Sequence, residues 1–412
     1  PCGTLFPYTT LFRSVLEGII AYSKRLSGEA RKLADAETSD PTARDELLEI
    51  ARIYDHVPDQ PARSFREGLT TIWICWTAIH LENPNIGLSL GRLDQLLYDL
   101  YRQDIEKGAM TVEDAVELVC CFWLKIGDHV PAVPIAGEKL FGGSGSNQAI
   151  TLGGVDEHGN DAVNDLTYVM LRATELMKLR DPNLNARYYS GVNTEAYLKR
   201  LCQVNIETGA TPAIHNDRAV IAALTAKGDT PAQARDYGIV GCVEPASNGR
   251  CYGHSAAILL NLASVLELTL FNGRHRHTGL DRVVSVETGR PAGFEQFKEA
   301  FRTQLHWMVD QTTDLNNYLG AIHQDFYPTP ILSSLFEGPM ESGKDLIQGG
   351  AVVNASAATI IGLADVADSL SALQTHVFGS NRALTFPELV KALEHDFAGR
   401  EGLRALLTNP EK

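Results

Sequence analysis

The chain has 412 residues, 44% hydrophobic and 21% charged, without a run of eighteen apolar residues, so we expect a globular protein with no transmembrane helix. Its 36 basic and 51 acidic residues give a net charge of -15, which argues against nucleic acid or membrane as a partner. Seven cysteines without framework spacing indicate free thiols in a reducing compartment, and hence a cytoplasmic location.

Residues 1–14 differ in character from the rest of the chain. LFPYTTLFRS at 5–14 resembles translated sequencing-adapter sequence, and the segment lacks the basic region and apolar stretch of a signal peptide. We therefore interpret 1–14 as non-native, and expect 15–412 to be a fragment of a longer protein.

Helical periodicity alternates with short strand patterns along the chain. Apolar residues recur at three- and four-residue spacing in 15–26, 44–54, 64–82, 92–106, 112–126 and 163–178. Thr111 and Asp114 match a capping box, which predicts a helix from Val112. Runs bounded by glycine and proline predict strands at Ala149–Val155, Leu184–Tyr189, Thr211–Ile214, Gly238–Val243 and Ala351–Asn354. The alternation predicts one continuous α/β body.

The segment 228–273 carries the most informative pattern. A brief strand is predicted at 239–240, followed by a turn at 241–245, whose sequence is GCVEP. A long apolar helix is then predicted to open at His254 or Ser255 and to close before residue 273.

Cys242 and Glu244 are candidate catalytic residues in that turn. In extended backbone, residues i and i+2 point to the same side, so the thiol and the carboxylate would face one cavity. A sulfur reagent and an acid/base partner need this proximity. A lone cysteine usually serves as a small buried hydrophobic residue, and this alternative for Cys242 stays open. The eight residues between Cys242 and Cys251 match no common zinc spacing, so we predict no metal site.

RDYGIVGCVEP at 235–245, followed by GHSAAILLNLASVLELTLFNG, resembles the thiyl-radical loop of the glycyl radical enzymes, the family that includes pyruvate formate-lyase. Similar stretches follow the family's order over roughly residues 60–380, at 90–108, 149–168, 181–189, 211–217 and 348–370. The resemblance implies part of a ten-stranded α/β barrel, built from two antiparallel five-stranded half-barrels and surrounded by helices.

The resemblance also implies radical chemistry. In the family, a glycyl radical abstracts hydrogen from the loop cysteine, here Cys242, which then abstracts hydrogen from a small organic substrate. Glu244 matches the glutamate that takes a substrate proton in the eliminating members. Cys242 has no adjacent cysteine, unlike pyruvate formate-lyase, so we expect C–O, C–N, C–S or C–C cleavage of the dehydratase, lyase and decarboxylase branches. Ser255 follows His254 where diol dehydratases carry aspartate, which argues against a diol substrate.

Substrate-binding candidates come from several parts of the chain. Ser144, Asn147 and Gln148 lie in a glycine-rich stretch where the family places such side chains, although an ordinary loop is the alternative. Arg187 is a candidate for a substrate carboxylate, with a structural salt bridge as the alternative. His254 and Ser255, in the loop that follows Cys242, complete this set. His215, Asn216 and Asp217 follow a predicted strand, where a turn or capping role is equally expected.

The Arg-Val-x-Gly-aromatic segment that bears the family's radical does not occur in these residues. We therefore expect the C-terminal glycyl radical domain to lie outside this chain, which would bind no cofactor and be inactive by itself. The parent protein would need a radical S-adenosylmethionine iron–sulfur activating enzyme, and the family predicts a homodimer. Two alternatives stay open, namely fumarate addition as in aryl- and alkylsuccinate synthases, and a catalytically silent barrel.

Overall fold

The structure is a computed structural model that describes residues 5–83, 87–128, 148–275, 288–380 and 382–408. The side chains of 5–9 and 254–257 lie outside this description. The chain divides into two compact units, which comprise residues 1–253 with 324–354, and residues 254–323 with 355–412.

Helices in the first unit are α1 (Leu5–Ala36), α2 (Pro41–His56), α3 (Phe65–Glu82), α4 (Leu93–Leu96), α5 (Tyr98–Glu106), α6 (Val112–Gly127), α8 (Asp165–Met177), α9 (Glu195–Thr208), α10 (Asp217–Ala226), α11 (Pro231–Arg235), α14 (Pro330–Ser333) and α15 (Pro339–Ser342), with the 3-10 turn η1 (Leu346–Gln348). The helices predicted around 44–54, 64–82, 112–126 and 163–178 are therefore confirmed. The helix predicted at 15–26 is longer, and the one predicted at 92–106 is interrupted at Leu97.

Side-chain caps explain where several helices begin. The Thr111 hydroxyl accepts from the Asp114 N–H and the Asp114 carboxylate accepts from the Thr111 N–H, which confirms the capping box before α6. Asn164 and Thr167 form the same arrangement before α8. The helices therefore start where polar side chains can bond the exposed N–H groups of the first turn.

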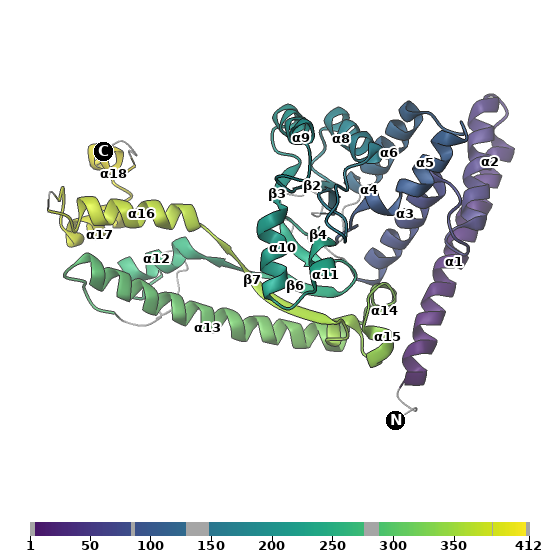
Figure 1. Ribbon diagram of the computed structural model, residues 1–412. Coiled ribbons are helices and arrows are strands. Elements are labelled where there is room, and N and C mark those ends of the chain that lie inside the picture. Colours follow the sequence, from purple (N-terminus) through teal and green to yellow (C-terminus); the bar gives the residue numbers. More distant parts are fainter. Residues whose placement is uncertain (1–4, 84–86, 129–147, 276–287, 381, 409–412) are drawn as a thin grey trace. The chain divides into compact units, whose positions relative to one another are not determined.

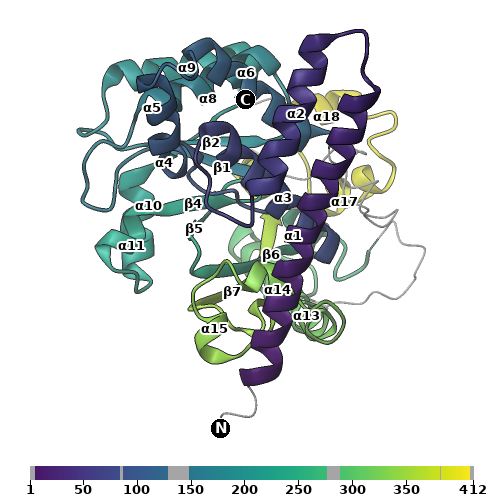
Figure 2. The same cartoon turned by 90° about the vertical axis from the view of Figure 1, so that its right-hand side faces the viewer.

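A parallel sheet with strands in the order β1 (Ala149–Gly153), β2 (Asn183–Tyr188) and β3 (Ala213–Asn216) forms the centre of the first unit. Its strands confirm the predictions at 149–155 and 184–189, whereas β3 shares only residues 213–214 with the strand predicted at 211–214. One face is apolar, because Ile150, Leu152, Leu184 and Ala186 share a buried core with α6, α8 and α9. Those helices cover this face in both views (Figures 1 and 2).

The opposite face of the sheet is polar. Asn183, Asn185 and Arg187 alternate along β2, and Thr151 of β1 lies opposite Asn185 in the strand register. A hairpin of β4 (Tyr237–Val240) and β5 (Glu244–Ser247) lies on this side, where the Ile239 N–H donates to Thr151 Oγ1 at 2.8 Å. Parallel sheets usually bury apolar side chains on both faces, so this polar face points to a special role.

The long apolar helix predicted from His254 or Ser255 is wrong. Residues Cys251–Asn261 form strand β6, which pairs with β7 (Val353–Ile361), and the helix α12 covers only Leu262–Leu270. The Asn261 side chain accepts from the Ala263 N–H and so starts this helix. This apolar sequence adopts strand geometry because pairing with another strand overrides helix propensity.

The second unit has its own core. Helix α13 (Phe294–Phe326), helix α16 (Leu363–His376) and helix α17 (Phe386–Glu394) contribute to it with α12, and α18 (Glu401–Leu407) follows. Val265 and Phe297 are fully buried at its centre. Over the part of the chain that the structure describes, the strands form sheets of three, two and two strands rather than a closed barrel. None of the described helices is long and apolar enough to cross a membrane.

Candidate functional site

Cys242 lies at the tip of the β4–β5 hairpin. Val240 pairs with Glu244, so Gly241, Cys242 and Val243 form a three-residue turn. Gly241 has φ +60°, a left-handed conformation that glycine adopts without strain. The prediction that Cys242 and Glu244 share one extended segment is therefore wrong. The Glu244 side chain nevertheless folds back onto the turn, since its Oε2 accepts from the Val243 N–H at 2.8 Å, and its charge acts on the Cys242 thiol.

Two neighbouring segments hold the tip of the hairpin. The Asn183 side chain, at the start of β2, donates to the carbonyl oxygens of Gly241 (2.9 Å) and Cys242 (2.6 Å). The Gly241 N–H donates to the Gly87 carbonyl at 3.0 Å. A Cβ on Gly87 would lie 3.3 Å from the Gly241 Cα, so the two backbones approach closely. The turn that carries the thiol is thus bonded to the sheet through Asn183 and, through Gly241, to the segment before α4.

The electrostatic surroundings of the Cys242 thiol are mainly acidic. Partial burial raises its pKa, and the Glu244 carboxylate raises it further. The Arg180 guanidinium lowers this pKa, whereas the Asp181 carboxylate raises it. These surroundings favour the protonated thiol over the thiolate.

Asp181 is a buried carboxyl group beside this thiol. Only 4% of the residue is exposed, and burial raises its pKa to about 6 although the Gln148 N–H donates to it. Its Oδ1 atom is buried without a hydrogen-bond partner in the described structure.

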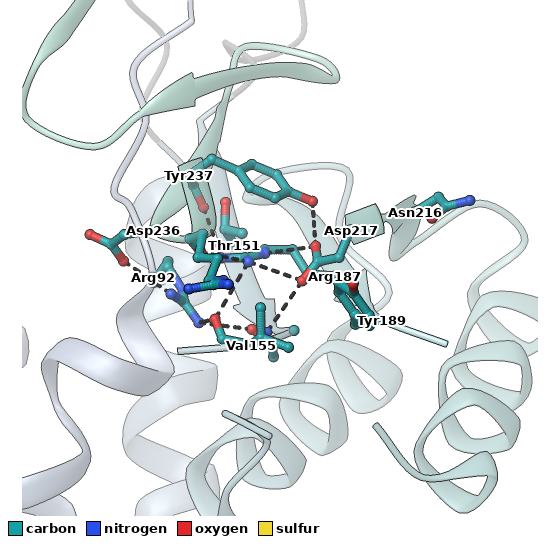
Figure 3. Close-up of polar contacts among 12 residues, drawn as sticks. Arg92, Thr151, Val155, Arg187, Tyr189, Asn216, Asp217, Asp236 and Tyr237 are labelled. Atoms are coloured by element: carbon teal, nitrogen blue, oxygen red, sulfur yellow. Dashed lines mark hydrogen bonds and ion pairs between the residues drawn. The ribbon is translucent and has the colours of Figure 1, made fainter. Parts of the chain in front are cut away.

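A buried ion pair anchors the other end of β4 (Figure 3). Arg187 and Asp217 are both 0% exposed, and the guanidinium donates to the carboxylate through Nε at 2.9 Å and Nη2 at 3.0 Å. Asp217 also accepts from the Tyr237 hydroxyl at 2.6 Å, at the first residue of β4. Arg187 further donates to the carbonyls of Tyr237 (3.1 Å) and Arg235 (2.7 Å). The pair therefore ties β2 and the start of α10 to the start of the hairpin.

A second buried arginine strengthens the same end. Arg92 donates to Asp236 Oδ1 at 3.0 Å, and to the carbonyls of Gly153 and Val155, each at 3.0 Å (Figure 3). Burial lowers its pKa, and the nearby Arg187 charge lowers it further. Since Asp236 immediately precedes β4, both arginines fix the point at which the hairpin leaves the helix α11.

The predicted site residues are placed as follows. Gln148 is fully buried just before β1 and accepts from Trp76 Nε1 at 2.6 Å. Ser144 and Asn147 lie outside the described residues, as do the side chains of His254 and Ser255 in β6.

Arg187 makes the structural salt bridge that the sequence left as its alternative. Its bonds to Asp217 and to main-chain carbonyls lie inside the protein, which favours a supporting role over contact with a substrate. In the segment His215–Asp217, Asn216 caps α10 by accepting from the Ala219 N–H, and His215 Nε2 bonds Asn185 Oδ1 at 2.9 Å.

Sequence reasoning missed Asn183 and Asp181 and assigned no ion pair to Asp217. The signal for Asn183 was the alternation N-L-N-A-R in β2, which places its polar side chains on one face. Asp181 and Asp217 carry no such local signal. Among the described residues, no three histidine, cysteine or acidic side chains gather as a metal site requires.

Comparison with known proteins identifies the family. A family model described as pyruvate formate lyase-like matches residues 8–412. Trans-4-hydroxy-L-proline dehydratase of Clostridioides difficile is 32% identical over 402 residues, 95% of this chain and 50% of that protein. Isethionate sulfite-lyase of Nitratidesulfovibrio vulgaris is 32% identical over 418 residues, 99% of this chain and 50% of that protein.

Solved structures agree with this result. The glycerol-bound B12-independent glycerol dehydratase of Clostridium butyricum matches with a TM-score of 0.89 and 33% identity, over 98% of this chain and 51% of that one. A glycyl radical enzyme of Archaeoglobus fulgidus matches with a TM-score of 0.85 and 32% identity, over 98% of this chain and 54% of that one. The chain thus spans about half the length of the relatives it matches. The family that the sequence resembles is confirmed, and the chain belongs to the pyruvate formate lyase-like family of glycyl radical enzymes.

Proposed function

We propose that the full-length protein is a glycyl radical lyase in which Cys242 exchanges hydrogen atoms with a small organic substrate and Glu244 moves a substrate proton. Membership of the pyruvate formate lyase-like family, with Cys242 in the turn of the hairpin and Glu244 two residues away, carries this proposal, and the raised pKa of the Cys242 thiol is consistent with it. A nucleophilic cysteine needs a thiolate and therefore surroundings that lower its pKa. A hydrogen-atom donor instead needs an intact S–H bond, which burial and the Glu244 carboxylate favour.

The turn supports this chemistry. A glycyl radical in the parent protein supplies the acceptor for the hydrogen atom of the Cys242 thiol. The sulfur then takes a hydrogen atom from a substrate carbon, so that a C–H bond breaks and an S–H bond forms. Glu244, two residues away, accepts a proton from the substrate while the leaving group departs. Cys242 returns its hydrogen atom to the product, so the overall reaction needs no external oxidant or reductant.

The names of the relatives favour C–O or C–S cleavage of a small polar substrate. Three of them act on trans-4-hydroxy-L-proline, isethionate and (2S)-3-sulfopropanediol, which each carry an acid group, whereas the glycerol dehydratase acts on an uncharged substrate. We propose an acid-bearing substrate contacted by Ser144, Asn147, His254 and Ser255, whereas Gln148, which is fully buried and bonded to Trp76, supports the site from inside the protein. Because its bonds are made inside the protein, Arg187 supports the hairpin in this proposal and does not contact the substrate.

We also propose which part of the parent protein this chain forms. Residues 15–412 would form part of the ten-stranded barrel, and the C-terminal radical domain would lie in the remainder. The activating enzyme would be a radical S-adenosylmethionine iron–sulfur protein, and the parent would form a homodimer. The coverage of about half of each relative supports the division into two parts.

The test uses the full-length protein, activated anaerobically and supplied with hydroxyproline, isethionate and sulfopropanediol. Cys242→Ala should abolish turnover at an unchanged glycyl radical content, measured by electron paramagnetic resonance. Cys202→Ala is the matched control, because Cys202 is exposed to a similar degree but lies on α9. Turnover by Cys242→Ala at the wild-type rate would refute the proposal.

A further inference from the structure

Cys242 can act on a substrate only if its sulfur points in a defined direction. The Cα–Cβ bond of a residue is oriented by its own backbone N, Cα and C atoms. The carbonyls of Gly241 and Cys242 stand on either side of the Cys242 Cα. A group that bonds both carbonyls therefore restricts both backbone dihedrals of Cys242 and sets the direction in which its side chain leaves the turn.

Asn183 is such a group. Its Nδ2 carries two N–H bonds, and they reach the Gly241 and Cys242 carbonyls at 2.9 and 2.6 Å. Because both acceptors are carbonyl oxygens, only the NH2 end of the amide can make these contacts. We propose that Asn183 is a positioning residue that fixes the orientation of Cys242 for hydrogen-atom transfer.

Asn183 is itself firmly placed. It is the first residue of β2, the central strand of the sheet, and pairs with Ala149 in the register. Its N–H donates to the Gln148 carbonyl at 2.8 Å, and its carbonyl accepts from the Asn185 side chain at 3.0 Å. A side chain on a rigid strand can impose a geometry on a turn that is too short to hold one by itself.

The two ends of β2 hold different parts of the hairpin. At its C-terminal end, Arg187 and Asp217 hold the start of β4, whereas Asn183 at its N-terminal end holds the tip of the hairpin. Loss of Asn183 should therefore free the turn while the strand pairing of the hairpin stays in place. This separation allows positioning to be tested apart from folding.

The first test needs no turnover. In the full-length protein before activation, hydrogen exchange of residues 239–245 is compared between wild type, Asn183→Leu and Asn354→Leu. Leucine has nearly the shape of asparagine but no donor. Asn354 is the matched control, because it also donates to two backbone carbonyls, those of Gly349 and Ala351. We expect exchange in 239–245 to accelerate about tenfold or more in Asn183→Leu only.

The second test is kinetic and rests on the proposed function. In the activated protein, kcat of Asn183→Leu should fall on the order of 100-fold, with KM within about twofold of wild type. An equal loss in Asn354→Leu, or a fall that appears only in KM, would overturn the positioning role. If the wild type shows no turnover, the proposed function fails, but hydrogen exchange still decides the role of Asn183. Unchanged exchange in 239–245 would refute it.

Discussion

The buried pair of Arg187 and Asp217 allows a quantitative prediction. Asp217→Asn keeps the size of the side chain but removes the charge opposite a guanidinium that is 0% exposed. Asp217 accepts four hydrogen bonds, two from Arg187 and one each from Tyr237 and the Val155 N–H. The nearby Arg92 would add repulsion to the uncompensated charge. Removal of one partner of such a pair costs about 3–5 kcal/mol, and we expect the unfolding free energy to fall by that amount.

Pulse proteolysis along a urea titration measures this change in the full-length protein. Asp99→Asn is the matched control, since Asp99 pairs with Arg102 while 91% exposed and should contribute less than about 1 kcal/mol. The double variant Arg187→Met with Asp217→Asn should recover much of the loss, because no charge then remains buried. A cost below about 1 kcal/mol for Asp217→Asn, or no recovery in the double variant, would refute the reasoning.

Two further predictions concern stability. The folded pKa of Asp181, about 6, lies above its ordinary value of 3.8, so burial of the carboxylate penalises the folded state above pH 6 but not below pH 4. Asp181→Asn should therefore raise the free energy of unfolding at pH 8 by at most about 3 kcal/mol, which a higher melting temperature would show. An equal effect at pH 4 would contradict this. Gly154→Ala should destabilise by about 1–3 kcal/mol more than Gly191→Ala. Both glycines have positive φ, but only at Gly154 would a Cβ meet Asp217 Oδ2 at 2.5 Å and Arg187 Cβ at 2.7 Å. Equal urea midpoints for the two variants would refute the steric argument.

The sequence predicts those features that depend on neighbouring residues. Cys242 and Glu244 are two positions apart, and the strands of the sheet lie in short runs between turn residues. Asn183 and Cys242 are 59 residues apart, so their hydrogen bond exists only once β2 and the hairpin have met. The same reason explains β6, whose strand form depends on pairing with β7, and Arg187, whose role depends on Asp217.

The two unlike faces of the sheet have a consequence for local opening. If the β4–β5 hairpin moves away, water can hydrate the side chains of Asn183, Asn185 and Thr151, because they are polar. Opening of the face toward α8 and α9 would be unfavourable, since Leu152 and Leu184 would lose their apolar surroundings. Release of the cysteine-bearing hairpin would thus expose only the small apolar cluster of Ala149, Tyr237 and Ile239, while the larger hydrophobic layer on the other face of the sheet stays covered.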